Sequence, residues 1–68
     1  MKIKINGEEK FLDKQINLSI LIQKQLDGKD TKGIAVAVNY TIVPKQKWES
    51  VAINENDAVE IVHAVQGG

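Results

Sequence analysis

The chain is short, has no net charge and lacks cysteine, and these properties exclude several functions. Its 68 residues allow one domain with a small core. Nine lysines balance nine acidic residues without any arginine, which argues against a nucleic-acid partner. The absence of cysteine excludes a disulfide framework, a thiolate zinc site and a cysteine nucleophile, so any sulfur must be borrowed. No apolar run approaches the ~20 residues of a membrane span, and we expect a cytoplasmic protein that binds no membrane.

A turn signal between two alternating segments predicts that the chain begins with a β-hairpin. Asn6-Gly7 is among the strongest short hairpin signals. A two-residue turn would pair Ile3 with Lys10 and place Phe11 on the face opposite Ile3. One bulged residue would instead bring Phe11 beside Ile3. The sequence leaves both registers open.

Apolar residues at helical spacing then predict one helix. The residues that form its buried stripe are Leu18, Leu21, Ile22 and Leu26. Asn17 is the expected N-cap, and Gly28 is expected to supply the left-handed residue after the helix. The polar face has no cationic stripe, so this helix packs against the core and binds no membrane surface.

An unbroken apolar run at residues 34–38 indicates a central strand. If Ile34, Val36 and Val38 face the single helix, then Ala35 and Ala37 lie on the opposite, helix-free face. The last strand adds Val62 and Ala64 to that face by the same alternation. A flat surface of small apolar side chains predicts a partner-binding site.

Between these strands lie a turn, a short edge strand and the single tryptophan. Asn39-Tyr40-Thr41 is typical of a turn before Ile42-Val43, and Pro44 suits the end of an edge strand. Trp48 is expected to plug the core at one end of the sheet, with its indole N–H bonded to a partner.

The chain ends in an alternating strand followed by two glycines. His63 shares the face of Val59 and Ile61, and we interpret it as a partly buried strand residue without a role in proton transfer. Gly67 and Gly68 lack side chains, so the last backbone units can enter a cleft too narrow for a Cβ atom. The alternative is a frayed end or a cloning remnant.

The order of elements indicates an α+β fold of the β-grasp (ubiquitin-like) kind. In this fold a mixed sheet of four to five strands packs on one main helix, and the first and last strands can lie parallel at its centre. We expect residues 1–68 to form a single β-grasp domain with a flexible C-terminal tail at residues 66–68.

The segment from Val36 to Trp48, VAVNYTIVPKQKW, resembles the V-N-x-x-I/V-V-P-x-x-x-W segment of the ThiS sulfur carriers. The flanking segments agree with that family, so the resemblance covers essentially the whole chain. Three residues depart from the family pattern: Tyr40 replaces a frequent glycine, Asn56 replaces the glycine of Gly-Asp, and Gln66 replaces a third terminal glycine. None of these departures removes a reacting atom.

The resemblance implies a sulfur carrier in thiamine (thiazole) biosynthesis, which is a substrate of partner enzymes and not itself an enzyme. A ThiF-like adenylating enzyme would use ATP to adenylate the Gly68 carboxylate. A sulfur-donor protein would then supply sulfur, and the thiocarboxylate would donate it to a ThiG-like thiazole synthase. We expect no cofactor or metal on this chain, which would be a monomer alone.

The expected site has two parts. Gly68 carries the reacting carboxylate and Gly67 gives access for the tail. The expected partner-binding residues are Ala35, Ala37, Val62, Ala64, Val65 and Gln66.

Two other classes of function share part of this pattern. A molybdopterin-synthase small subunit or a ubiquitin-like protein modifier would have the same fold and a Gly-Gly end. Neither accounts for Asn39, Pro44 and Trp48 together. A β-grasp binding or regulatory module that does not use its C-terminus would leave Gly67 and Gly68 dispensable.

Overall fold

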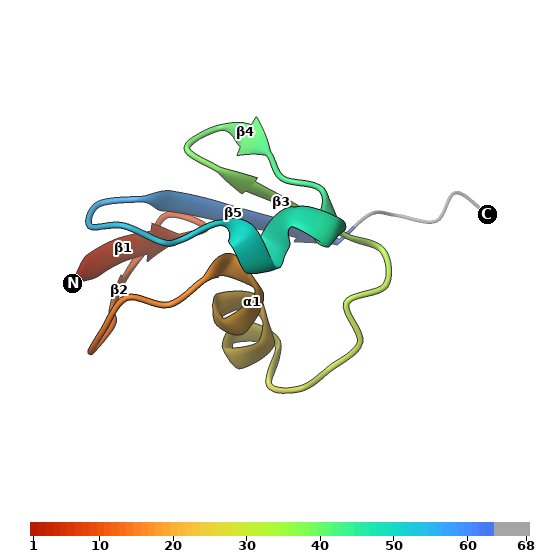
Figure 1. Cartoon of the computed structure of the whole chain (residues 1–68), viewed down its shortest axis with the longest axis horizontal. Coiled ribbons are helices and arrows are strands. Elements are labelled where there is room, and N and C mark those ends of the chain that lie inside the picture. Colours follow the sequence, from red (N-terminus) through yellow and green to blue (C-terminus); the bar gives the residue numbers. More distant parts are fainter. Residues whose placement is uncertain (64–68) are drawn as a thin grey trace.

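The computed structural model describes residues 1–63 and shows a five-stranded mixed sheet with one main helix packed on one of its faces (Figure 1). In chain order the elements are β1 (Lys2–Ile5), β2 (Glu8–Phe11), α1 (Leu18–Leu26), β3 (Ile34–Val38), β4 (Thr41–Ile42), the 3-10 helix η1 (Lys45–Ser50) and β5 (Ala58–His63). The strand order is β2-β1-β5-β3-β4, with β1 parallel to β5 and the other pairs antiparallel. The predicted α+β arrangement, with the first and last strands parallel near the centre, is confirmed.

The hairpin between β1 and β2 has a two-residue turn. Asn6 and Gly7 have φ angles of 51° and 85°, as a type I′ turn requires. Ile3 pairs with Lys10, which settles the register that the sequence left open. Phe11 consequently lies on the face opposite Ile3, where 76% of its surface is exposed. The favoured turn geometry therefore outweighs the burial of this one aromatic ring.

Helix α1 has the predicted limits. The side-chain Oδ1 of Asn17 accepts a hydrogen bond from the Ile20 N–H at 2.8 Å, which confirms the N-cap. At the other end, Asp27 adopts the left-handed conformation with φ 54°, and Gly28 follows it with φ 78°. The left-handed end thus begins one residue earlier than predicted, at an aspartate, one of the few non-glycine residues that tolerate this region.

The core lies between α1 and the covered face of the sheet. Its buried residues are Ile3, Ile5, Leu18, Leu21, Ile22, Val36, Trp48, Ile53, Val59 and Ile61. The indole Nε1 of Trp48 donates to the Val43 carbonyl at 2.9 Å, which confirms the expected partner of this ring. Ile53 is fully buried, and its N–H donates to the Ile16 carbonyl at 2.9 Å, which joins the segment after η1 to the residues just before α1.

His63 corrects one prediction. It lies in β5 and pairs with Ile34, as a strand residue should, but its side chain is exposed and not partly buried. Ile61, two residues earlier on the same face, is 8% exposed, so the core ends between Ile61 and His63.

Candidate functional site

The helix-free face of the sheet carries the predicted partner-binding residues that the structure describes. Ala35 pairs with Val62 across β3 and β5, and Ala37 lies two residues further along β3 on the same face. The side chains of Val36 and Ile61, one residue removed, are buried on the other face. Val62 is 58% exposed, which is high for a central strand. The structure therefore brings these three residues together on an open surface.

Sequence reasoning missed one member of this surface. Ile42 of β4 is the cross-strand partner of Ala37 and is exposed, so it extends the apolar surface to the edge of the sheet. Alternation along residues 41–43 could have predicted that Ile42 lies on this face, because neighbouring strand residues face opposite sides and Val43 is half-buried on the other side. We call the set Ala35, Ala37, Ile42 and Val62 the apolar surface.

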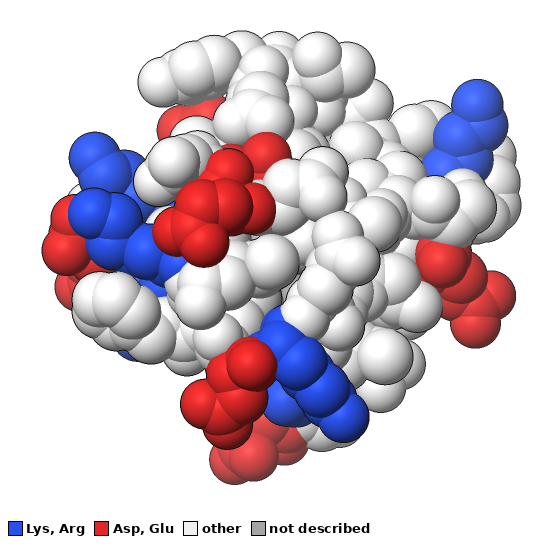
Figure 2. Space-filling view, turned by 60° about the vertical axis from the view of Figure 1, so that its left-hand side comes forward, with Lys and Arg blue, Asp and Glu red and all other residues white. Residues whose placement is uncertain are grey.

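Few charged side chains lie around the β3–β4 hairpin, which carries part of the apolar surface. In Figure 2 the uppermost part of the molecule, where Figure 1 places the β3–β4 hairpin, carries almost only uncharged side chains. Elsewhere in that view lysines and acidic residues lie next to one another, without an extended region of one sign. Tyr40, at the tip of the hairpin, is 84% exposed. Apolar packing, and not a strong electrostatic field, is what this region offers a partner.

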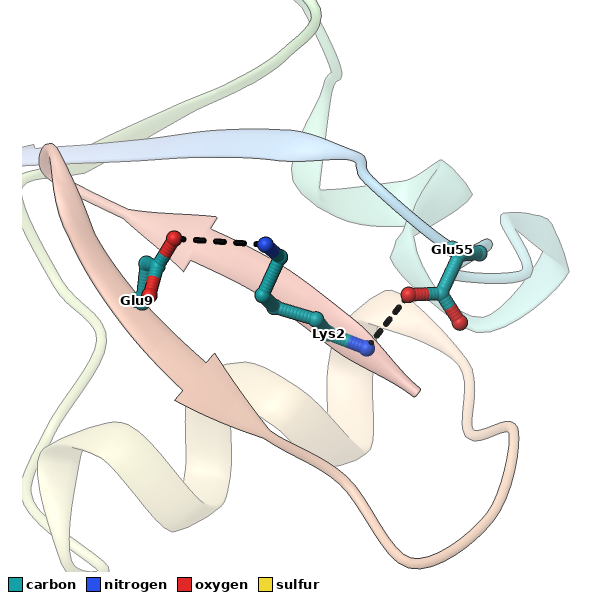
Figure 3. A network of polar contacts seen from close by, with 3 residues as sticks. All are labelled: Lys2, Glu9 and Glu55. Carbon is teal, nitrogen blue, oxygen red and sulfur yellow. Dashed lines mark hydrogen bonds and ion pairs between the residues drawn. The ribbon is translucent and has the colours of Figure 1, made fainter.

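Lys2 joins three segments at the start of the sheet (Figure 3). Its backbone N–H donates to Oε2 of Glu55 at 2.8 Å, and its Nζ lies 3.4 Å from Oε2 of Glu9. A hollow of about 400 Å³ lies next to these groups and is bordered by Lys4 and Tyr40. All of them surround the beginning of β5, because Lys4 pairs with Ala58. These contacts lie at the end of the sheet where β1 and β5 begin.

Two asparagines in left-handed turns bind the backbone of β5 through their side chains. Asn39 and Asn6 both have φ 51°. The Oδ1 of Asn39 accepts from the Ala58 N–H at 3.0 Å, and its Nδ2 donates to Oδ1 of the buried Asp57 at 3.0 Å. Asn6 makes the corresponding contacts with Ile61: its Oδ1 accepts from the Ile61 N–H at 2.8 Å, and its Nδ2 donates to the Ile61 carbonyl at 3.2 Å. Both asparagines were predicted only as turn residues.

The residues predicted to carry the chemistry come directly after β5. Gly68 and Gly67, together with the expected contact residues Ala64, Val65 and Gln66, lie outside the described residues. Within residues 1–63, no three His, Cys, Asp or Glu side chains are grouped so that they could hold a metal ion. Over the same range, no helix has the length and apolarity to cross a bilayer.

Two solved structures have this fold. A crystal structure of the thiamine biosynthesis protein ThiS from Geobacter metallireducens matches with a TM-score of 0.84 and 21% identity, over 100% of both chains. A solution structure of a thiamine biosynthesis protein from the same organism matches with a TM-score of 0.76, over 100% of this chain and 88% of that one. The fold is therefore a β-grasp domain of the type seen in ThiS.

Sequence comparison identifies the family. The ThiS family profile matches residues 3–68. The chain belongs to the ThiS family, the sulfur carriers of thiamine biosynthesis.

The relatives are of two lengths. A thiazole synthase of Paramagnetospirillum magneticum is 38% identical over 68 residues, which are 100% of this chain but 20% of that protein. The protein ycf40 of Porphyra purpurea is 35% identical over 68 residues and 93% of its length. The ycf40 of Trieres chinensis is 36% identical over 64 residues, which are 94% of this chain and 85% of that protein. The chain thus spans one fifth of the thiazole synthase and most of the ycf40 proteins.

Proposed function

We propose that this chain carries sulfur as a thiocarboxylate on Gly68 and delivers it for thiazole formation in thiamine biosynthesis. The observation that carries the proposal is the extent of the family match, which runs from residue 3 to residue 68 and so includes Gly67-Gly68. The thiazole synthase relative supports the choice of acceptor, because a segment 38% identical to this chain occurs within that protein.

The chemistry requires an activated carboxylate. A carboxylate is a poor electrophile, so a ThiF-like enzyme transfers AMP from ATP to Gly68 and releases pyrophosphate. Sulfur at the oxidation level of sulfide then attacks the Gly68 carbonyl carbon, forms the C–S bond and expels AMP. A donor protein must supply this sulfur, because this chain has no cysteine of its own. ATP is bound by the activating enzyme and not by this chain. The product is the thiocarboxylate that a ThiG-like thiazole synthase accepts.

In this sequence of steps, the chain docks on its partner enzymes and presents its terminal carboxylate to them. The apolar surface offers exposed Val62 and Ile42 beside small alanines, which lets a flat partner surface approach closely. The absence of a Cβ atom at Gly67 would let the final peptide unit enter a narrow channel. We therefore assign binding to the sheet and reactivity to the terminal carboxylate.

A change of one residue at the end tests this assignment. Adding one alanine after Gly68 moves the carboxylate out of register with the adenylation site and leaves residues 1–63 unchanged. Gly67→Val adds a β-branched side chain where the channel is narrow. We expect both variants to lose ATP–pyrophosphate exchange with the purified activating enzyme at saturating carrier, while binding to that enzyme remains nearly normal.

The control is the native chain, with folding checked by the fluorescence of the buried Trp48. Exchange by the extended chain at the native rate would show that the Gly68 carboxylate is not the reacting group. An intact mass in which one oxygen is replaced by sulfur, measured on protein from its own host, would support the thiocarboxylate directly.

A further inference from the structure

Hydrogen bonds between β1 and β5 continue past the last bond between their backbones, through the side chain of Asn6. The last backbone hydrogen bond between these strands runs from the Asn6 N–H to the Val59 carbonyl at 2.9 Å. The chain then turns away at Gly7 to form β2. At this point the Asn6 side chain takes the place of the next peptide group: Oδ1 accepts from the Ile61 N–H at 2.8 Å, and Nδ2 donates to the Ile61 carbonyl at 3.2 Å.

The turn alone does not explain this residue. A type I′ turn accepts aspartate or glycine as well as asparagine at its first central position, because each tolerates a positive φ. Only the amide offers a donor and an acceptor together, as a peptide group does. Asn6 therefore supplies two bonds to β5 that the other turn residues cannot supply.

These two bonds lie at the root of the tail. Ile61 directs its backbone N–H and carbonyl toward β1, whereas Val62 pairs with Ala35 of β3 on the other side. Strand β5 is thus held from both sides up to this point. The tail expected from the sequence, residues 66–68, begins five positions beyond Ile61.

We propose that Asn6 is a positioning residue that fixes the direction in which β5 delivers the tail to the activating enzyme. This inference rests on the proposed function, since it assigns Asn6 to the adenylation of Gly68. Its physical basis is that a fixed strand narrows the range of positions that the Gly68 carboxylate can reach, so that more of its approaches to the adenylation site are productive. Loss of the two bonds would free the root of the tail on the β1 side.

The chain contains a matched control for this idea. Asn39 has the same φ of 51°, and its Oδ1 accepts from the Ala58 N–H of β5, while its Nδ2 donates to the side-chain carboxylate of Asp57. It acts at the opposite end of β5 from the tail. A role in stability alone predicts the same consequence for both asparagines, whereas positioning predicts a difference.

The experiment compares Asn6→Gly with Asn39→Gly, because glycine keeps each left-handed turn and removes only the amide. ATP–pyrophosphate exchange with the purified activating enzyme is measured against carrier concentration, at a temperature where Trp48 fluorescence shows each variant to be folded. We expect Asn6→Gly to lower the maximal rate about tenfold while the half-saturating concentration changes less than about twofold. Asn39→Gly should retain the native maximal rate within about twofold.

Equal losses of maximal rate in the two glycine variants, or a native rate for Asn6→Gly, would overturn the inference. Asn6→Asp is a second variant, which keeps the turn and the acceptor but cannot donate to the Ile61 carbonyl. We expect a reduced maximal rate, and a native rate would also overturn the inference. Failure of the native chain itself to support exchange would refute the proposed function together with this role of Asn6.

Discussion

Two neighbouring residues of β5 provide a sharp test of the two faces of the sheet. Ile61 is 8% exposed and faces the core, whereas Val62 is 58% exposed on the helix-free face. Replacing each in turn by aspartate introduces the same charge one residue apart. We expect Ile61→Asp to unfold the domain, and Val62→Asp to fold but bind partners weakly.

The magnitudes follow from burial. Losing the buried Ile61 side chain costs about 2 to 3 kcal/mol. An unpaired carboxylate in its place costs several kcal/mol more, or remains protonated at a similar cost. A 68-residue domain has a free energy of unfolding of about 3 to 10 kcal/mol, so this substitution removes most or all of that stability. Val62→Asp should cost at most about 1 kcal/mol, because its surface is already largely in water.

Stability is measured by urea unfolding, with Trp48 as the probe because it is buried and the sole tryptophan. Docking is measured as binding to the activating enzyme and to thiazole synthase, where Val62→Asp should lose at least about tenfold in affinity, or ~1.4 kcal/mol. Gln23→Asp places the same charge on exposed α1 and should leave binding unchanged. If both β5 variants fold, or both unfold, the assignment of the two faces is wrong. Native affinity for Val62→Asp would remove this residue from the docking surface.

Two further predictions concern backbone geometry and need only the isolated domain. Asn17→Ala should lower the free energy of unfolding by about 1 kcal/mol, because the Ile20 N–H loses its cap, and Asn17→Ser should recover most of that loss in the same urea titration. Tyr40 has φ 70°, a left-handed conformation that is unfavourable for a bulky residue, so Tyr40→Gly should be more stable than Tyr40→Ala by about 1 kcal/mol. Equal stabilities of the two Tyr40 variants would contradict the left-handed turn.

Local rules were sufficient wherever one short segment determined the structure. The N-cap at Asn17 and the turn at Asn6-Gly7 depend on residues within a few positions of each other, and both are confirmed. The faces of β3 and β5 followed from alternation, since Val36 is buried and Val62 is exposed as predicted. These features depend on side-chain periodicity and backbone dihedral preferences, which the sequence contains directly.

The sequence was insufficient where two distant segments compete or cooperate. In the first hairpin, the preference of Asn6-Gly7 for a two-residue turn competes with the burial of Phe11. Local sequence patterns do not show which of the two determines the register. The buried residue Ile53 forms a backbone hydrogen bond with Ile16, which is 37 positions earlier. The contact of Asn6 with Ile61 spans 55 positions and has no local sequence signal.

The position of β5 between β1 and β3 also affects how the chain can be damaged. Strand β5 joins the β1–β2 hairpin to the β3–β4 hairpin within the sheet, and it pairs with partners far away in sequence. A protease cut between Phe11 and Ala58 would break the covalent link between β5 and the β1–β2 hairpin, and an isolated two-stranded hairpin is at best marginally stable in water. Damage to the chain therefore bears most on β1 and β2, because within the sheet they are joined to the other strands through β5.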